Sequence, residues 1–249
     1  MSFWLLIIIG GICAGFIQGL SGFGFGLVSL AIWSWVLAPE IAVPVVVAGS
    51  LVGQLLATRS LRKNIDVHKA TPFLIGGALG LPFGLWLLSL MSPLLFKFIV
   101  GLLLCFYCLT MLLSNKDRRW SWGGRFADGL MGWLGGVSSG FGGIPGALPT
   151  LWCNLRGWDK HQQRSVFLLF NLFMHTITFS SFVVLGLINK EVIKIIIIVV
   201  PSILIPTAIG IHLYSRFSDK AFRFVVLSLL FCSGLLLVFA TVPKILLSW

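Results

Sequence analysis

The sequence predicts an all-α integral membrane protein built from two inverted repeats of about five helical segments each, with helices broken by glycines. Three observations support this prediction: an apolar composition, a series of apolar segments and a duplicated glycine-rich motif. Of the 249 residues, 58% are hydrophobic and 10% are charged, and the mean hydropathy is +1.03. A soluble domain carries about 25% charged residues, because water must cover its surface. Lipid must therefore cover much of this chain.

Ten apolar segments can be delimited along the chain. Segments of about 20 residues can cross the hydrocarbon core, whereas pieces of about 10 to 14 residues are typical of half-helices or re-entrant helices. The two short pieces, 25–38 and 144–154, each follow a glycine-rich break, so about eight full spans are expected. The segments lie at 3–20, 25–38, 41–58, 72–90, 94–113, 127–140, 144–154, 165–187, 193–213 and 221–243.

The two halves of the chain repeat each other. The run SGFGFG beginning at Ser21 recurs as SGFGGI beginning at Ser139, 118 positions later. Near the end of each half, residues 84–92 and 96–100 have counterparts 126 positions later, with matched glycine, serine and basic positions. We therefore expect a first transmembrane repeat over 1–113, a cytoplasmic linker over 114–126 and a second transmembrane repeat over 127–249.

The positions of the basic residues predict the orientation. Four clusters in loops between the segments hold 14 of the 18 Lys and Arg residues, and such clusters mark the cytoplasmic side. If each glycine-broken pair of segments returns to its starting side, all four clusters face the cytoplasm and both termini lie on the non-cytoplasmic side of the cell (inner) membrane. The net charge of +11 then reflects topology. Nucleic acid is excluded as a partner, because no continuous basic face can form. The four clusters are Arg59, Arg62, Lys63 and Lys69; Lys116, Arg118, Arg119 and Arg125; Arg156, Lys160 and Arg164; and Arg216, Lys220 and Arg223.

The glycine-rich breaks predict a site for an anion. Glycine costs about 1 kcal/mol relative to alanine within a helix, so these runs interrupt the helices. A helix N-terminus inside a membrane protein presents unpaired N–H groups and a positive partial charge. Two such ends, one from each half, would converge on an anion at the interface of the repeats. The candidates are Ser21, Gly22, Gly24 and Gly26 in the first break, and Ser139, Gly140, Gly142, Gly143 and Pro145 in the second.

The alternative for the glycines is close helix packing, because small residues spaced by four let membrane helices approach each other without a ligand. The glycines that fit this alternative are Gly11, Gly15, Gly19, Gly132, Gly136 and Gly140.

Polar side chains deep within apolar segments are further candidates, because they are costly there without a function. Ser50 and Gln54 lie four residues apart in the third segment of the first half, and Asn171 and His175 lie four apart in the equivalent segment of the second. Each pair therefore shares one helix face. We expect Gln54 and Asn171 to donate hydrogen bonds to an oxyanion and His175 to carry a coupling proton. The alternative for His175 is a neutral histidine hydrogen-bonded between helices.

The chain resembles the TauE/SafE (sulfite exporter-type) permeases. The resemblance rests on GFIQGLSGFGFGLVSL at 15–30, GGVSSGFGGIPGALPTLW at 135–152, and the basic loops after the third segment of each half. It implies transport of small anions, including sulfite and organosulfonates, by a secondary transporter that uses an ion gradient. Phe25 departs from the fuller pattern, which favours a glycine as at Gly143.

Other function classes receive less support. A membrane-embedded enzyme lacks a paired carboxylate within a segment, a zinc-protease motif and a plausible Ser/His/Asp arrangement, so the chain is predicted not to be an enzyme. A passive anion channel or an accessory membrane subunit remains the alternative to a transporter. We expect no cofactor and no metal. The expected partners are a small anionic substrate, the lipid bilayer and, as one option, a second copy of the chain in a homodimer.

Overall fold

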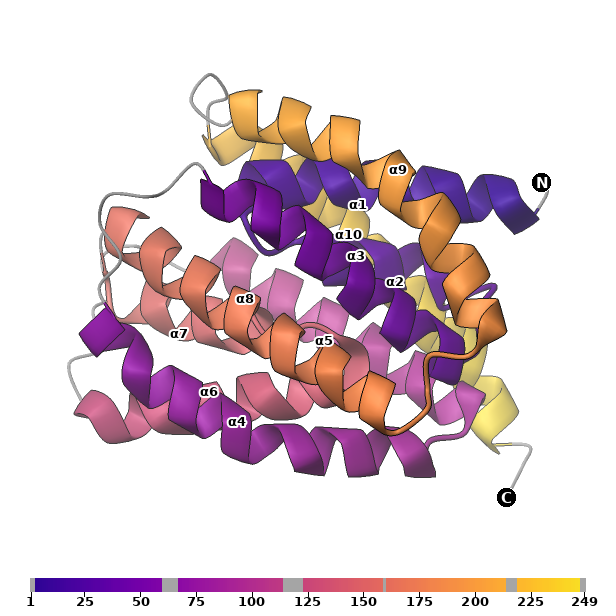
Figure 1. Ribbon diagram of the computed structural model, residues 1–249, viewed down its shortest axis with the longest axis horizontal. Coiled ribbons are helices and arrows are strands. Elements are labelled where there is room, and N and C mark those ends of the chain that lie inside the picture. The colour runs from indigo at the N-terminus through magenta and orange to yellow at the C-terminus, as the bar shows by residue number, and fades with distance from the viewer. Residues whose placement is uncertain (1–2, 60–66, 114–122, 159, 214–218, 247–249) are drawn as a thin grey trace.

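The computed structural model describes residues 3–59, 67–113, 123–158, 160–213 and 219–246. Within these ranges the chain forms ten α-helices and no strand, which confirms the all-α prediction. The helices run broadly along one direction, horizontal in Figure 1, and the start of α1 and the end of α10 lie at the same end of the bundle. The predicted linker at 114–126 lies outside the described residues as far as residue 122. The helices are α1 (Phe3–Ser21), α2 (Phe25–Trp33), α3 (Pro39–Arg59), α4 (Val67–Leu90), α5 (Pro93–Leu113), α6 (Gly124–Gly142), α7 (Ala147–Leu155), α8 (Lys160–Val184), α9 (Lys190–Leu213) and α10 (Asp219–Leu246).

The ten helices follow the ten predicted segments, and the two short helices differ most from them. The segment predicted over 25–38 gives α2, which ends at Trp33, and α3 then begins with a proline, Pro39, a residue suited to the first helical position. The segment predicted over 144–154 gives α7, which begins at Ala147 after the N-cap residue Gly146. Pro145 disfavours helical geometry at Ile144, so α7 does not include that residue.

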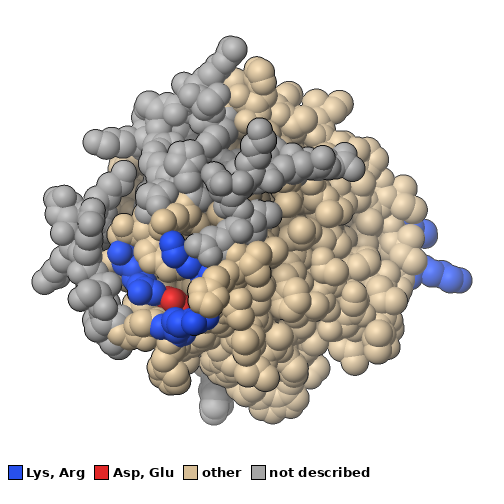
Figure 2. All heavy atoms as spheres, turned by 60° about the vertical axis from the view of Figure 1, so that its left-hand side comes forward, with Lys and Arg blue, Asp and Glu red and all other residues tan. Residues whose placement is uncertain are grey.

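The helices are those of a multi-pass membrane protein. Seven helices in the described residues are long and apolar enough to cross a membrane: α1, α3, α4, α5, α8, α9 and α10. The sequence predicted about eight spans; α6 has 19 residues, as α1 does, but is not among the seven. Large apolar side chains such as Leu79 and Ile205 are more than two-thirds exposed on the flanks. Figure 2 shows the described charged side chains gathered toward the ends of the bundle, with an uncharged flank between them that suits lipid.

The two repeats exchange helices. The most extensive helix contacts join α4 to α6, α1 to α9 and α5 to α10, so the fourth helix of each repeat packs on the first helix of the other. Each helix of one repeat has its counterpart five places along the chain in the other repeat. The pair α1–α9 therefore corresponds to α6–α4, and the pair α3–α9 corresponds to α8–α4. All four pairs are in contact. Figure 1 shows α1 beside α9 along one edge of the bundle and α4 beside α6 along the opposite edge. The contacts thus have the pairing expected of a duplicated chain.

The repeats run in opposite directions. The equivalent helices α5 and α10 are antiparallel, because Cys105 lies against the carbonyl of Phe231 whereas Gly101, one turn earlier, lies against Gly234 and Leu237. Equivalent helices that run in opposite directions define inverted repeats, an arrangement common among secondary transporters.

Glycines bring the exchanged helices into backbone contact. A Cβ added at Gly84 would lie 2.9 Å from the carbonyl carbon of Val137 in α6, and one at Gly15 would lie 3.0 Å from the carbonyl oxygen of Ile203 in α9. The packing interpretation is confirmed for the six glycines predicted on this basis. Each would place a Cβ within 3.0 Å of an atom in the partner helix: Gly11, Gly15, Gly19, Gly132, Gly136 and Gly140.

These contacts correct the register of the repeat at the breaks. Gly19 packs on the backbone at Gly210 of α9, and Gly140 packs on the backbone at Gly84 of α4. Since Gly84 and Gly210 are counterparts, Gly19 and Gly140 are also counterparts, 121 positions apart. Gly22 and Gly143, likewise 121 apart, both have left-handed backbone geometry, with φ of 83° and 66°. The SGFG match at 118 positions is therefore three residues out of structural register, and the counterpart of Phe25 is Gly146 rather than Gly143.

Candidate substrate site

The two breaks meet in the interior of the bundle. Every glycine predicted for the site is buried, as is Pro145, and Ser21 is half-buried. A Cβ added at Gly26, near the start of α2, would lie 2.8 Å from the carbonyl oxygen of Gly143. The structure therefore brings together the two glycine runs that the sequence singled out.

Each broken pair of helices turns back on itself. Trp33 at the end of α2 lies back along α1 against Gly10, near the middle of that helix, and Arg156 at the end of α7 bonds Asp128 near the start of α6. Both short helices are therefore re-entrant, and they place their N-termini inside the protein.

Side chains of α1 satisfy most amides of the first break. Ser21 Oγ accepts hydrogen bonds from the amides of Gly24 at 3.0 Å and Phe23 at 3.4 Å, and donates one to the carbonyl of Ile17. Gln18 Oε1 accepts from the amide of Phe25 at 3.0 Å, and the carbonyl of Gln18 accepts from the amide of Gly22. Ser21 therefore caps the break, and its role as a substrate contact stays a prediction.

The second break is closed by the end of α6. The amides of Gly143 and Ile144 donate to the carbonyls of Ser139 and Ser138 at 2.8 and 3.3 Å. These bonds form a C-terminal turn that requires the left-handed glycine at 143. Ser139 Oγ lies 2.8 Å from Thr178 Oγ1 of α8. The N-cap residue of α7 is Gly146, which has no side chain to accept from the amides of the first turn.

Helix α8 places two predicted residues beside this open N-terminus. Asn171 is 1% exposed, and a Cβ added at Gly146 would lie 2.7 Å from its Oδ1 and 2.9 Å from its Nδ2. His175 is 4% exposed and lies one turn further along α8. Both polar atoms of Asn171 and the Nδ1 of His175 have no hydrogen-bond partner within the described residues.

Helix α3 supplies the other predicted pair. Ser50 is 1% exposed, and its Oγ has no partner in the part of the chain that the structure describes. Gln54 is fully buried; its Oε1 accepts from Gln18 Nε2 at 2.9 Å, and its Nε2 donates to the carbonyl of Leu168 in α8 at 3.1 Å. Gln54 thus links α1 to α8, and its contact with substrate stays a prediction.

Two buried polar residues of this region are not among those predicted from the sequence. Gln18 is 1% exposed and joins the first break to α3. Thr150 lies on α7, one turn after Gly146, and its Oγ1 has no partner among the described residues. The rule that selected Gln54, a polar residue within an apolar segment, would also have found Gln18. The two other unpartnered buried atoms, on Trp33 and Ser34, lie at the far end of α2.

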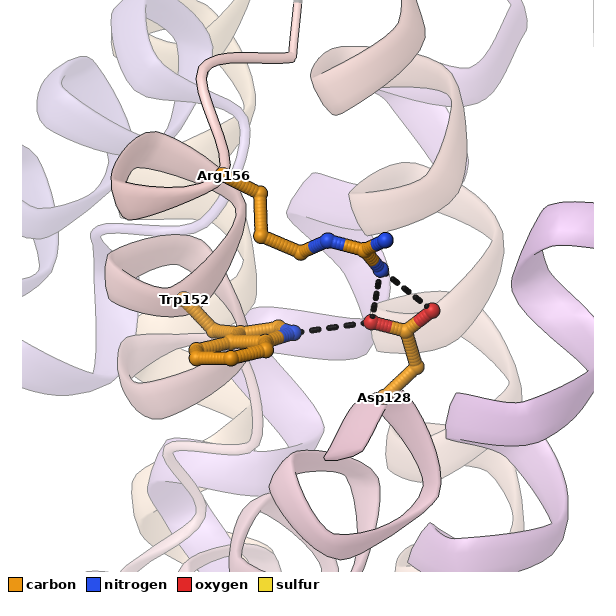
Figure 3. Close-up of polar contacts among 3 residues, drawn as sticks. All are labelled: Asp128, Trp152 and Arg156. Atoms are coloured by element: carbon orange, nitrogen blue, oxygen red, sulfur yellow. Dashed lines mark hydrogen bonds and ion pairs between the residues drawn. The ribbon is translucent and has the colours of Figure 1, made fainter. Parts of the chain in front are cut away.

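An ion-pair cluster lies at the end of α7 that is away from the site. Arg156 Nη1 donates to both carboxylate oxygens of Asp128 at 2.6 and 2.8 Å, and Trp152 Nε1 donates to Asp128 Oδ1 at 2.8 Å (Figure 3). The guanidinium of Arg156 also lies 5.5 Å from the ring centroid of Trp158 and 6.0 Å from that of Trp152. The cluster fastens α7 to α6.

The fold defines the class of protein: a multi-pass membrane protein of inverted repeats, whose two re-entrant helices meet at a buried polar centre. A comparison with protein families matches residues 7–237 to the family described as Sulfite exporter TauE/SafE. The chain therefore belongs to the TauE/SafE family, a family of membrane permeases, as its motifs suggested. A search of curated proteins and a search of solved structures each gave no match.

Proposed function

We propose that this permease moves small anions, specifically sulfite or organosulfonates, across the inner membrane and draws on an ion gradient. The substrate binds at the meeting point of the two breaks. Its other partners are the bilayer and, as one option, a second copy of the chain.

One observation carries this proposal: three of the residues predicted to bind substrate leave buried polar atoms unpaired. Ser50 Oγ, Asn171 Nδ2 and Oδ1, and His175 Nδ1 have no partner within the described residues. An unsatisfied buried polar group costs about 1 to 3 kcal/mol, so such groups in a native protein call for a ligand or water. An oxyanion supplies acceptors for the amide of Asn171 and the hydroxyl of Ser50.

The N-terminus of α7 supports a negative charge at the same place. Gly146 begins this helix beside Asn171, and the positive end of the helix dipole attracts an anion. His175 stands one turn away on α8 and can exchange a proton with the site as transport proceeds. We assign to His175 the coupling role.

Orientation follows from the basic residues. The bundle end that carries Lys69, Arg125 and Arg156 faces the cytoplasm under the positive-inside rule. Both termini then lie outside.

Efflux from proteoliposomes tests the proposal. The purified protein is reconstituted into proteoliposomes that are loaded with sulfite or ethanesulfonate, and efflux of the anion is followed with and without an imposed pH gradient. We expect saturable efflux that the gradient accelerates. Efflux that ignores the gradient and does not saturate would assign a channel instead, and no flux of either anion would refute the proposal.

Two substitutions on α8 then test the residues. Asn171→Leu keeps the size of the side chain and removes both polar atoms, so we expect loss of anion binding. His175→Ala should keep binding and lose the acceleration by the pH gradient. The matched control is Thr176→Ala at the neighbouring position, because Thr176 is exposed and bonds only the carbonyl of Leu172 in its own helix. A His175→Ala protein with an unchanged response to the gradient would refute the coupling role.

A further inference from the structure

The two repeats place different polar side chains at equivalent positions of the centre. With the 121-residue register, Gln18 corresponds to Ser139 and Gln54 to His175. In the first repeat, Gln18 Nε2 donates to Gln54 Oε1 at 2.9 Å. In the second repeat, Ser139 pairs with Thr178 instead, and His175 Nδ1 has no partner among the described residues.

The glutamine pair closes the first-repeat half of the centre. Gln18 also accepts from the amide of Phe25 at 3.0 Å, and Gln54 donates to the carbonyl of Leu168 at 3.1 Å. These bonds occupy an amide of the break and the carboxamides of both glutamines. Among the described residues, the first repeat therefore offers a ligand one buried unpaired side-chain group near its break, the hydroxyl of Ser50.

The residue at the start of each short helix, α2 and α7, also differs between the two repeats. Phe25 begins α2, and its ring lies against Gly49 of α3 and edge-to-face with Trp33, with ring centroids 6.0 Å apart. The counterpart of Phe25 is Gly146, whose missing side chain leaves room for Asn171. At this position the first repeat thus has a packed aromatic ring, and the second repeat has a glycine beside an unpaired amide side chain.

We infer that the site is one-sided: it binds a small anion with a single charged head group held by the second repeat, and Gln18 sets this specificity by closing the first repeat. The inference rests on the proposed function. The head group lies at Gly146 and Asn171, and the uncharged end of the substrate lies toward Phe25. A second charge at that end would be buried with the hydroxyl of Ser50 as its one side-chain donor among the described residues, which is unfavourable.

Two sulfonates of equal carbon length test the inference in proteoliposomes. We expect ethanesulfonate to compete for transport at least about tenfold more strongly than ethane-1,2-disulfonate, the factor that corresponds to one lost charge-assisted hydrogen bond. Equal competition by the two compounds would overturn the one-sided site and leave the proposed function standing. Competition by neither compound, with no sulfite transport, would refute the proposed function and the inference with it.

The variant Gln18→Ser tests the role of Gln18. It gives the first repeat the residue of the second, frees the amide N–H of Phe25 and leaves Gln54 Nε2 bonded to the carbonyl of Leu168. We expect competition by the disulfonate to strengthen about tenfold, because the released amide N–H of Phe25 can now donate to its second charge, while competition by ethanesulfonate changes less than about threefold. Gln162→Ser, the same change at an exposed position of α8, should alter neither value. A Gln18→Ser protein that binds both compounds more weakly by the same factor would show a purely structural role and overturn the assignment.

Discussion

The ion pair between Asp128 and Arg156 gives a prediction that can be worked from the structure. The carboxylate of Asp128 is 7% exposed, and the side chain of Arg156 is 20% exposed. Substitution Asp128→Asn removes the negative charge and keeps an oxygen that can accept from Trp152. It leaves the guanidinium of Arg156 without its counter-ion beside two tryptophan rings.

The expected loss of stability follows from these exposures. Removing one partner of a fully buried ion pair costs about 3 to 5 kcal/mol, because the other charge stays uncompensated. Arg156 keeps partial contact with solvent, which screens its charge, so we expect about 2 to 3 kcal/mol. At about 2 to 4 °C for each kcal/mol, the scaling for domains of 150 to 250 residues, Tm should fall by about 4 to 12 °C.

Thermal unfolding in detergent, followed by tryptophan fluorescence, measures this change. Arg125→Gln removes an exposed charge from the same end of α6 and should leave Tm within about 2 °C of the parent. The double variant Asp128→Asn/Arg156→Gln removes both charges and should recover most of the loss, because no unpaired charge remains. A single variant as stable as the parent, or a double variant no better than the single, would refute this account of the cluster.

Three further substitutions have predicted effects on stability. Gly80→Ala should destabilise the bundle by about 1 to 3 kcal/mol, because its Cβ would overlap the carbonyl of Trp133. Gly129→Ala lies at the same interface, but its Cβ would meet nothing closer than 3.6 Å, so this control should be tolerated. Measurements of Tm compare the two variants. Gly143→Ala should cost about 1 to 2 kcal/mol for its left-handed backbone and slow transport, and Gly129→Ala, away from the site, serves as its control in both assays. Thr207→Val removes the hydrogen bond from Thr207 Oγ1 to the carbonyl of Gly15 at 3.0 Å and should lower stability by only about 0.6 kcal/mol. A fall in Tm as large as that of Gly80→Ala would mean that backbone contact does not dominate the stability of the helix pairs.

The sequence was sufficient to predict the helices and the two breaks, because both depend on local chemistry. Apolar length separates the segments, and glycine with proline interrupts them wherever the chain folds. The same reasoning found Asn171 and His175, since a polar side chain in an apolar segment is costly in any arrangement of helices.

The remaining features depend on contacts between distant parts of the chain. The letters SGFG match at 118 positions, but the physical register of 121 is set by the helix that each glycine touches. The pairing of Asp128 with Arg156 required α7 to return to the start of α6, and the bonds of Gln54 required Gln18 and Leu168 as neighbours. Neither is encoded in spacing along the sequence.

The exchange of helices between the repeats also sets an order of events during synthesis. α6 finds its partner α4 already made, but the glycine face of α1 must wait for α9, which follows about 190 residues later. A ribosome adding about 5 to 20 residues per second needs roughly 10 to 40 s to reach it. During that interval Gly15 and Gly19 of α1 lack the helix that covers them in the folded protein, so α1 is made long before it is secured.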